Sequence, residues 1–185
     1  MPKRAFDVVL ALLALLLLAL PMLAAALAVW LDSGSPVLFT QWRAGLGGRP
    51  FRLYKFRSMV RDAASLGPYR TGRDDARITR VGRWLRRSSV DELPQLFNVL
   101  RGDMSLVGPR PDVLAQQADY RAEDWALRCS VRPGITGLAQ ALYRSRATPQ
   151  QRLAADLDYA RHHGMLRDLR ILAMTFRQLT QKSAN

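Results

Sequence analysis

The chain has 185 residues, a length typical of a single domain, and its one cysteine, Cys129, excludes an intrachain disulfide. It contains 28 Lys and Arg residues against 15 Asp and Glu residues, which gives a formal net charge of +13 at pH 7. This balance predicts polyanionic partners: nucleic acid, an anionic membrane surface or phosphorylated substrates. Arginine supplies most of the charge, and its planar guanidinium matches two phosphate oxygens. The adjacent His162 and His163 lack further Cys or His partners, so a zinc site is not expected.

The first predicted element is an apolar helix over residues 8–31, a stretch without any charged side chain. At a rise of about 1.5 Å per residue, it is long enough to cross a hydrocarbon core of about 30 Å. A core helix of a soluble protein would be shorter and amphipathic. Three interpretations remain: a signal peptide, a spanning helix and a re-entrant helix. The signal peptide fits least well, since the apolar run exceeds the usual length of roughly 7–15 residues.

Two features favour the re-entrant interpretation. Pro21 lies in the middle of the segment, where it removes a backbone donor and clashes with the preceding turn. Positive residues flank both ends, and positive flanks stay on the cytoplasmic side of a membrane. Lys3 and Arg4 form the first flank. The second flank comprises Arg43, Arg49, Arg52, Lys55 and Arg57. Asp7, at the edge of the apolar segment, is expected to pair with Arg4 or a downstream arginine.

The next elements form a predicted β-hairpin. Residues 36–41 and 51–56 are typical of strands, and residues 45–48 of a turn. Alternation places Phe51, Leu53 and Lys55 on one face of the second strand. Residues 61–75 are polar and predict a mobile loop, or a short helix followed by a loop.

A basic amphipathic helix is predicted over residues 78–87. Such a helix either lies on an anionic membrane surface or packs its apolar side against a core. Ser89 is a predicted N-cap for a second helix that runs to about Leu100 and stops at Gly102.

The remaining chain alternates predicted helices and loops. A rigid proline-rich connection is expected first and a second loop later, with helices between and after them. In order, the predicted segments are the connection 103–111, a helix 112–128, a loop 131–137, a helix capped by Thr148 and Pro149 that ends near His163, and an amphipathic helix 166–179 with a stripe of Leu169, Leu172, Phe176 and Leu179.

Asp91 and Glu92 stand at the start of a predicted helix. Acids favour a first turn because they oppose the helix dipole, which is sufficient as a structural explanation. Their surroundings suggest more, because Arg86 precedes the pair and Arg110 follows in a stiff Gly-Pro-Arg-Pro turn, and such groups bind anions. Two carboxylates would repel an anion unless a cation intervened, so Mg²⁺ bridging to a diphosphate is expected. An aspartate in that setting can also attack phosphorus.

Residues 88–111 resemble the signature of the bacterial monotopic phosphoglycosyl transferases, the bacterial sugar transferase domain. The resemblance covers nearly the whole chain, and a run of this length is highly specific. Its other parts are residues 3–7, Phe39-Thr40-Gln41 with Arg43 and Gly45, residues 54–59 and residues 131–137.

The resemblance implies a ping-pong reaction. Asp91 would attack the β-phosphate of a UDP-sugar, release UMP and pass the covalent phosphosugar to undecaprenyl phosphate. Glu92 matches the second carboxylate, with a role in metal binding or in deprotonation of the acceptor, and Mg²⁺ would be held by Asp91. The matching phosphate-binding residues are Lys55, Arg57, Arg86, Arg110 and Arg132.

The implied fold is α+β and mainly α. Residues 1–33 would form a re-entrant helix–break–helix with its kink at Pro21, and residues 34–185 a cytosolic catalytic domain with a β-hairpin and amphipathic surface helices. This places the chain at the cytoplasmic face of the bacterial inner membrane, in the first membrane step of glycoconjugate assembly such as exopolysaccharide or O-antigen. Membrane lipids are expected partners, and the resemblance leaves homodimer formation open.

Two other functions compete with the transferase. A non-catalytic adaptor or nucleic-acid binder would use the basic surface, but Trp42, Tyr54 and Trp84 are scattered and form no recognition module, so nucleic acid is not an expected partner. A membrane pyrophosphatase could use the same acids.

The sequence also departs from the family in having Leu20 where many relatives have serine, and in its segment 141–146.

Overall fold

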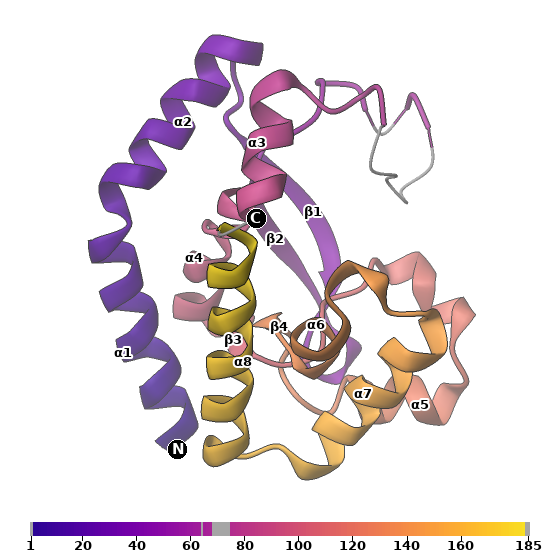
Figure 1. Cartoon of the computed structure of the whole chain (residues 1–185). Helices are drawn as coiled ribbons and strands as arrows, with labels where there is room; N and C mark the ends of the chain where they lie inside the picture. The colour runs from indigo at the N-terminus through magenta and orange to yellow at the C-terminus, as the bar shows by residue number, and fades with distance from the viewer. Residues whose placement is uncertain (1, 64, 68–74, 184–185) are drawn as a thin grey trace.

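The computed structural model describes residues 2–63, 65–67 and 75–183. The described part is mainly helical with short strands, as predicted (Figure 1). Its elements are α1 (Pro2–Leu17), α2 (Ala19–Ser33), β1 (Leu38–Ala44), η1 (Leu46–Gly48), β2 (Pro50–Phe56), α3 (Arg80–Ser88), η2 (Val90–Glu92), α4 (Gln95–Arg101), β3 (Ser105–Val107), η3 (Leu114–Asp119), α5 (Ala122–Arg128), β4 (Gly134–Thr136), α6 (Leu138–Tyr143), η4 (Arg144–Arg146), α7 (Pro149–His162) and α8 (Met165–Ser183), where η denotes a 3₁₀ turn.

The N-terminal apolar segment forms the predicted helix–break–helix. Helices α1 and α2 meet at Leu18 with a bend of 64°. Pro21 explains the position of the break, because it has no N–H to donate to the carbonyl of Leu17 and its ring pushes that carbonyl aside. Among the described residues no single helix has the length and apolar character to cross a membrane, whereas α1 and α2 together have both.

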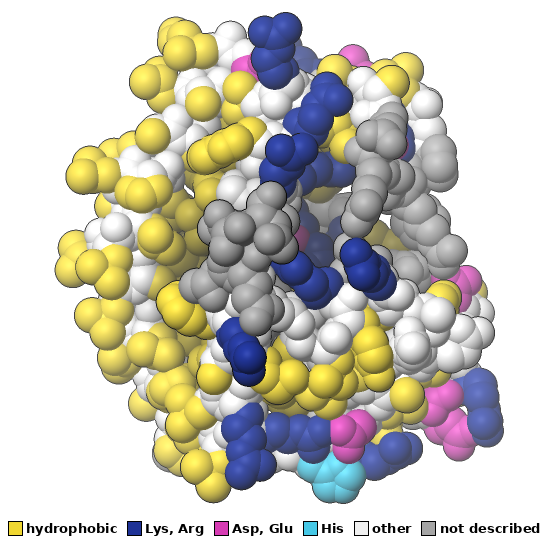
Figure 2. Space-filling view, in the orientation of Figure 1, with side chains coloured by type: hydrophobic (Ala, Val, Ile, Leu, Met, Phe, Trp, Pro, Cys, Tyr) yellow, Lys and Arg dark blue, Asp and Glu magenta, His cyan; other side chains and the backbone are white. Residues whose placement is uncertain are grey.

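Helices α1 and α2 form an arm, defined here as residues 2–33, that lies along one edge of the molecule (Figure 1). Its outer side is strongly apolar, as Figure 2 shows, with exposed leucines at Leu12, Leu16, Leu20, Leu23 and Leu31. A stable water-soluble surface rarely carries an apolar patch of this kind. The arm therefore presents a face suited to an apolar environment.

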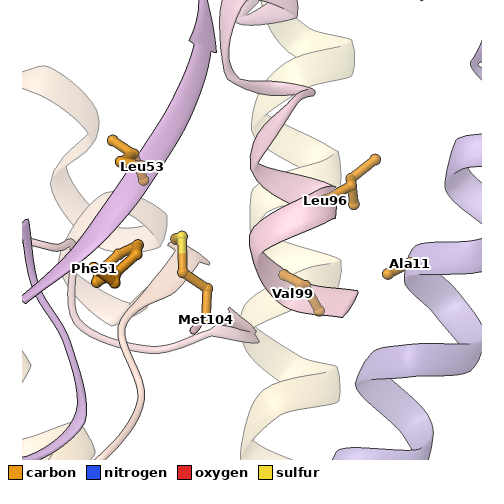
Figure 3. Packing of buried hydrophobic residues seen from close by; sticks show 6 residues of the cluster. All are labelled: Ala11, Phe51, Leu53, Leu96, Val99 and Met104. Carbon is orange, nitrogen blue, oxygen red and sulfur yellow. The ribbon is translucent and has the colours of Figure 1, made fainter. Parts of the chain in front are cut away.

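The inner side of the arm packs against the rest of the chain at two places. Ala11 of α1 lies in a buried cluster with Leu96 and Val99 of α4, and Phe51, Leu53 and Met104 complete that cluster (Figure 3). Further along, Val29 of α2 packs with Phe56 and Leu85. Both halves of the arm therefore rest on the same domain.

Polar contacts fasten the first turn of α1. Lys3 pairs with buried Asp168 of α8, and Arg4 donates to the carbonyls of Val99 and Leu100 at 2.5 and 2.9 Å. The expected pairing of Asp7 with an arginine is wrong. Asp7 is buried, accepts a hydrogen bond from the backbone N–H of Leu106 at 3.2 Å, and lies 3.8 Å from Lys3, because it faces β3 while Arg4 binds α4.

The predicted hairpin is present, although its first strand begins and ends later than expected. Strands β1 and β2 pair antiparallel, with Leu38 opposite Phe56 and Arg43 opposite Phe51. The predicted strand 36–41 is shifted because pairing with β2 determines where β1 starts. Phe51 and Leu53 enter the cluster with α4, whereas Phe56 points to α2 and α3.

A second small sheet was not expected. Strands β3 and β4 pair in parallel, with Ser105 opposite Gly134, in the two segments predicted as the connection 103–111 and the loop 131–137. Each strand has only three residues, too few to show a period. Gly134 permits the pairing because a Cβ there would overlap the backbone of Gly108.

The C-terminal helices differ from the expectation in detail. The predicted helix 112–128 is divided into η3 and α5, because Tyr120 and Arg121 adopt extended backbone angles between them. Helix α7 has the predicted cap, where Thr148 accepts from the N–H of Gln151. Helix α8 buries Ile171 and packs Leu172 of the predicted stripe against the same cluster, whereas Leu169 and Phe176 of that stripe are exposed. The predicted loop 61–75 falls partly outside the described residues.

Candidate active site

A sharp turn between α3 and α4 carries the two acids. Ser89 has a φ of 62°, which is a left-handed conformation that ends α3, and the 3₁₀ turn η2 follows at once. The predicted N-cap role of Ser89 is therefore wrong, since its side chain caps no helix. The turn directs Asp91 and Glu92 inward, where Asp91 is 7 % exposed.

Glu92 is the centre of an ion-pair group. One of its carboxylate oxygens accepts from Lys55 Nζ at 2.7 Å and from Arg110 Nη2 at 2.6 Å. Burial opposes the charged form, but the charges of Arg110 and Lys55 outweigh it and hold the pKa of Glu92 below its usual range. Glu92 is therefore an ionised group that orients two cations.

Asp91 has the opposite environment. In the described parts of the chain, its carboxylate takes part in no hydrogen bond or ion pair. Burial, followed by the charge of Glu92, raises the pKa of Asp91 to about 6, although Lys55, Arg86 and Arg110 act against the rise. Adjacent carboxylates with pKa values moved apart are typical of catalytic sites.

Three of the five predicted phosphate-binding residues surround this pair. The charges of Lys55, Arg86 and Arg110 all act on Asp91. Arg86 is kept in place by its Nε, which donates to Ser58 Oγ at 2.8 Å. The cations come from β2, α3 and the segment after β3, so the tertiary fold assembles the group.

The other two predicted residues bind backbone carbonyls elsewhere. Arg57 is buried and donates to the carbonyl of Ser33 at 2.8 Å and to Ser33 Oγ at 2.9 Å, at the end of α2. Arg132 donates to the carbonyl of Gly102 at 2.9 Å, beyond the C-terminal end of α4, whereas Asp91 precedes its N-terminal end. Neither side chain has a described contact with Asp91 or Glu92.

Arg43 is a further basic residue of this region, and the sequence predicted it as part of the positive flank and of the family resemblance but not as a phosphate-binding residue. It lines a small cleft next to the ion-pair group, together with Leu53, Lys55, Gln95, Arg110 and Pro111. The hairpin register could have indicated it, because Arg43 lies opposite Phe51 and so shares the face predicted for Lys55. Burial, and then the charge of Arg110, lower the pKa of Arg43 to about 10.

A buried charge network supports the segment that carries Arg110. Arg128 and Arg152 both donate to the carbonyl of Arg110, and both pair with Asp112. Arg128 Nε also donates to Asp156 at 2.9 Å. The network comes from α5 and α7, distant in sequence from the acids, and the sequence analysis did not detect it.

A metal ion at this site would depend on the carboxylates of Asp91 and Glu92. Within the described ranges, no group of three or more His, Cys, Asp or Glu residues could hold an ion. Asp91 nevertheless offers a carboxylate without a partner among the described residues, and Mg²⁺ is commonly bound by one or two carboxylates together with substrate phosphates. The residues present fit such a shared site.

An unpaired carboxylate among cations, next to a cleft with further basic groups, is typical of proteins that bind and transfer phosphorylated groups. Comparison with known families is consistent with this class. The model described as "bacterial sugar transferase" matches residues 1–182. The chain belongs to the bacterial sugar transferase family.

Three relatives illustrate the similarity. The UDP-glucose:undecaprenyl-phosphate glucose-1-phosphate transferase of Caulobacter vibrioides is 48% identical, over 94% of this chain and 67% of the relative. The undecaprenyl-phosphate glucose phosphotransferase of Komagataeibacter xylinus is 46% identical, over 95% of this chain and 35% of its own length. The exopolysaccharide production protein PSS of Rhizobium leguminosarum is 43% identical, over 92% of this chain and 90% of the relative.

Proposed function

We propose that this protein transfers a sugar-1-phosphate from a UDP-sugar to undecaprenyl phosphate and releases UMP, by way of a covalent intermediate on Asp91. The observation that carries the proposal is the contrast within the acid pair: Glu92 is bound by Lys55 and Arg110, whereas Asp91 is buried without a described partner. The names of two relatives support the substrate classes and suggest glucose as the first sugar to test.

The proposed first step forms an acyl phosphate. A carboxylate oxygen of Asp91 attacks the β-phosphorus, the phosphoanhydride bond breaks, and UMP leaves with the bonding electron pair. In the second step, a phosphate oxygen of undecaprenyl phosphate attacks the same phosphorus and frees the Asp91 carboxylate. Lys55, Arg86 and Arg110 would stabilise the negative charge of the phosphoryl group in both steps.

Glu92 has a supporting role in this proposal. It is ionised and accepts hydrogen bonds from two cations, which make it a weak base. We therefore do not assign it the deprotonation of the acceptor. Its carboxylate instead holds Lys55 and Arg110 at a fixed separation beside Asp91. Such preorganised charges cost little reorganisation at the moment of reaction.

Mg²⁺ belongs to the same proposal. Asp91 would hold the ion together with the diphosphate of the substrate, because the other acid, Glu92, is already paired. When bound, the ion would neutralise phosphate charge and polarise the phosphoryl oxygens.

We also propose that the arm is re-entrant and that the domain lies at the cytoplasmic face of the bacterial inner membrane, in contact with its lipids. Both ends of the arm rest on one domain, which supports entry and exit at one face. Figure 2 shows a band of Lys and Arg side chains beside the apolar edge, as expected for a surface at anionic headgroups. A lipid-linked phosphate lies at the same level.

A mass measurement tests the intermediate. The purified protein is incubated with Mg²⁺ and UDP-glucose, without lipid acceptor, and the intact mass is followed together with released nucleotide. We expect a phosphosugar adduct, mapped to Asp91, and an equal amount of UMP.

Variants make the test specific. Asp91→Asn should form no adduct, Glu92→Gln should form it on Asp91 more slowly, and Arg121→Gln, at a side chain 78% exposed, should match the wild type. An adduct that persists in Asp91→Asn, or its absence with every UDP-sugar tested, would contradict the covalent proposal. Release of inorganic phosphate instead of UMP would favour a pyrophosphatase.

A further inference from the structure

Arg43 lines the cleft beside the ion-pair group and forms no ion pair within the part of the chain that the structure describes. Asp112 and Glu92 are the acids whose charges act on Arg43. Asp112 already pairs with Arg128 and Arg152, and Glu92 with Lys55 and Arg110. Among the described residues, no carboxylate forms an ion pair with Arg43.

The hydrogen bonds of Arg43 lead to neutral oxygens. Nη1 donates to the carbonyl of Pro111 at 3.0 Å and Nη2 to Gln41 Oε1 at 2.6 Å. Nε is buried and has no hydrogen-bond partner in the described structure. An arginine has five N–H donors, so this guanidinium is held in place with donors to spare. A half-buried cation in that state favours an incoming anion.

The position of Arg43 indicates which phosphate it would meet. Arg43, Lys55 and Arg110 line the cleft, whereas Asp91 does not. The charge of Arg110 acts on both Asp91 and Arg43, so Arg110 lies near both groups. In an in-line displacement, the leaving oxygen lies opposite the attacking one.

On the basis of the function proposed above, we propose that Arg43 binds the phosphate of the leaving nucleotide, on the side of the cleft away from Asp91. Lys55 and Arg110 then hold the phosphoryl group that is transferred. This assignment makes Arg43 a determinant of donor binding and not of acceptor binding.

Binding of UMP and of uridine to the full chain in lipid nanodiscs with Mg²⁺ tests the assignment. A charge-assisted hydrogen bond is strong enough that Arg43→Gln should weaken UMP binding by about tenfold or more. Uridine, which lacks the phosphate, should bind Arg43→Gln as it binds the wild type, and this also shows that the variant is folded. Arg121→Gln serves as the matched control, because it removes an exposed arginine.

Two further measurements test two alternatives: that Arg43 acts only by positioning Arg110, and that the phosphate it binds belongs to the lipid acceptor. If Arg43 acted only by placing Arg110 through Pro111, Arg43→Gln would not weaken UMP binding further in an Arg110→Gln background; we expect a further loss of about tenfold there. In turnover, KM for the UDP-sugar should rise and KM for undecaprenyl phosphate should stay within about twofold.

Several results would overturn the assignment: unchanged UMP affinity, equal losses for UMP and uridine, no further loss in the Arg110→Gln background, or a rise confined to the KM of the lipid. A different result would contradict the proposed function. A wild-type protein that binds UMP but forms neither adduct nor lipid product would contradict the transferase while leaving the binding test of Arg43 intact.

Discussion

At the scale of single residues, folding disfavours the ionised form of the Asp91 carboxylate. Burial and the neighbouring Glu92 carboxylate raise the pKa of Asp91 from 3.8 to about 6, in spite of three nearby cations. The charged form that attacks phosphorus is thus the form that the fold destabilises. Proteins commonly accept such a local cost at a catalytic group.

This cost predicts how stability depends on pH. Because the folded pKa of Asp91 is higher than its unfolded value, the wild type loses stability as pH rises from about 4 to about 6. Asparagine does not ionise, so Asp91→Asn should be more stable than the wild type at pH 8, by at most about 3 kcal/mol. Thermal unfolding of both proteins at pH 4 and pH 8 measures this. The difference should be much smaller at pH 4, close to the unfolded pKa, and a variant less stable than the wild type at pH 8 would contradict the expectation.

At the scale of elements, the structure encoded by neighbouring residues was predicted well, whereas pairing between segments far apart in the sequence was not predicted. The apolar segment with its proline, the hairpin and the cap at Thr148 are encoded by neighbouring residues, and all are present. Strands β3 and β4 could not be predicted from the sequence, because each is short and its pairing partner lies far along the chain. Ser89 has a residue type typical of an N-cap, but the turn after α3 requires a left-handed residue there.

The bend of the arm can be tested by substitution at Pro21. Pro21→Ala restores the N–H that can bond to the Leu17 carbonyl, so the two helices should straighten. With a rise of about 1.5 Å per residue and the observed bend, spin labels at Val9 and Leu31 should move apart by about 5 Å. Both positions are exposed, and the measurement uses a Cys129→Ser background in nanodiscs. Leu20→Ala is the matched control, and an unchanged distance in Pro21→Ala would show that the proline does not cause the bend.

At the scale of the whole molecule, the site is an assembly of distant parts. The acid pair and Arg110 lie together in residues 88–111, the stretch that resembles the family signature, and Arg86 lies just before it, whereas Lys55 belongs to another part of the resemblance, residues 54–59. The chain has 28 Lys and Arg residues, so which other arginines face the site depends on tertiary packing. For this reason Arg57 and Arg132 were predicted as phosphate ligands but bind carbonyls, whereas Arg43 lines the cleft.

The contact between the first and last helices provides a test at the same scale. Asp168 is fully buried, pairs with Lys3 and accepts from Tyr159 Oη at 2.7 Å. Asp168→Asn leaves Lys3 with only its longer contact to Asp7 at 3.8 Å, which should cost about 2–3 kcal/mol and expose the first turn of α1 to hydrogen exchange. Asp158→Asn is the matched control, because its side chain is 46% exposed and pairs at the surface with Arg167. Equal exchange of residues 2–8 in both variants would contradict the role of this contact.

The same contact has a consequence for biosynthesis. Lys3 and its partner Asp168 are 165 positions apart, and ribosomes add roughly 5–20 residues per second. Roughly 8–33 seconds therefore pass between the synthesis of Lys3 and that of its partner in α8. During this interval Arg4 can already bind the carbonyls of Val99 and Leu100, but the ion pair of Lys3 with Asp168 cannot yet form. We therefore expect that the contacts of the arm with α4 form first, and that its first turn is fully fastened only after α8 has been translated.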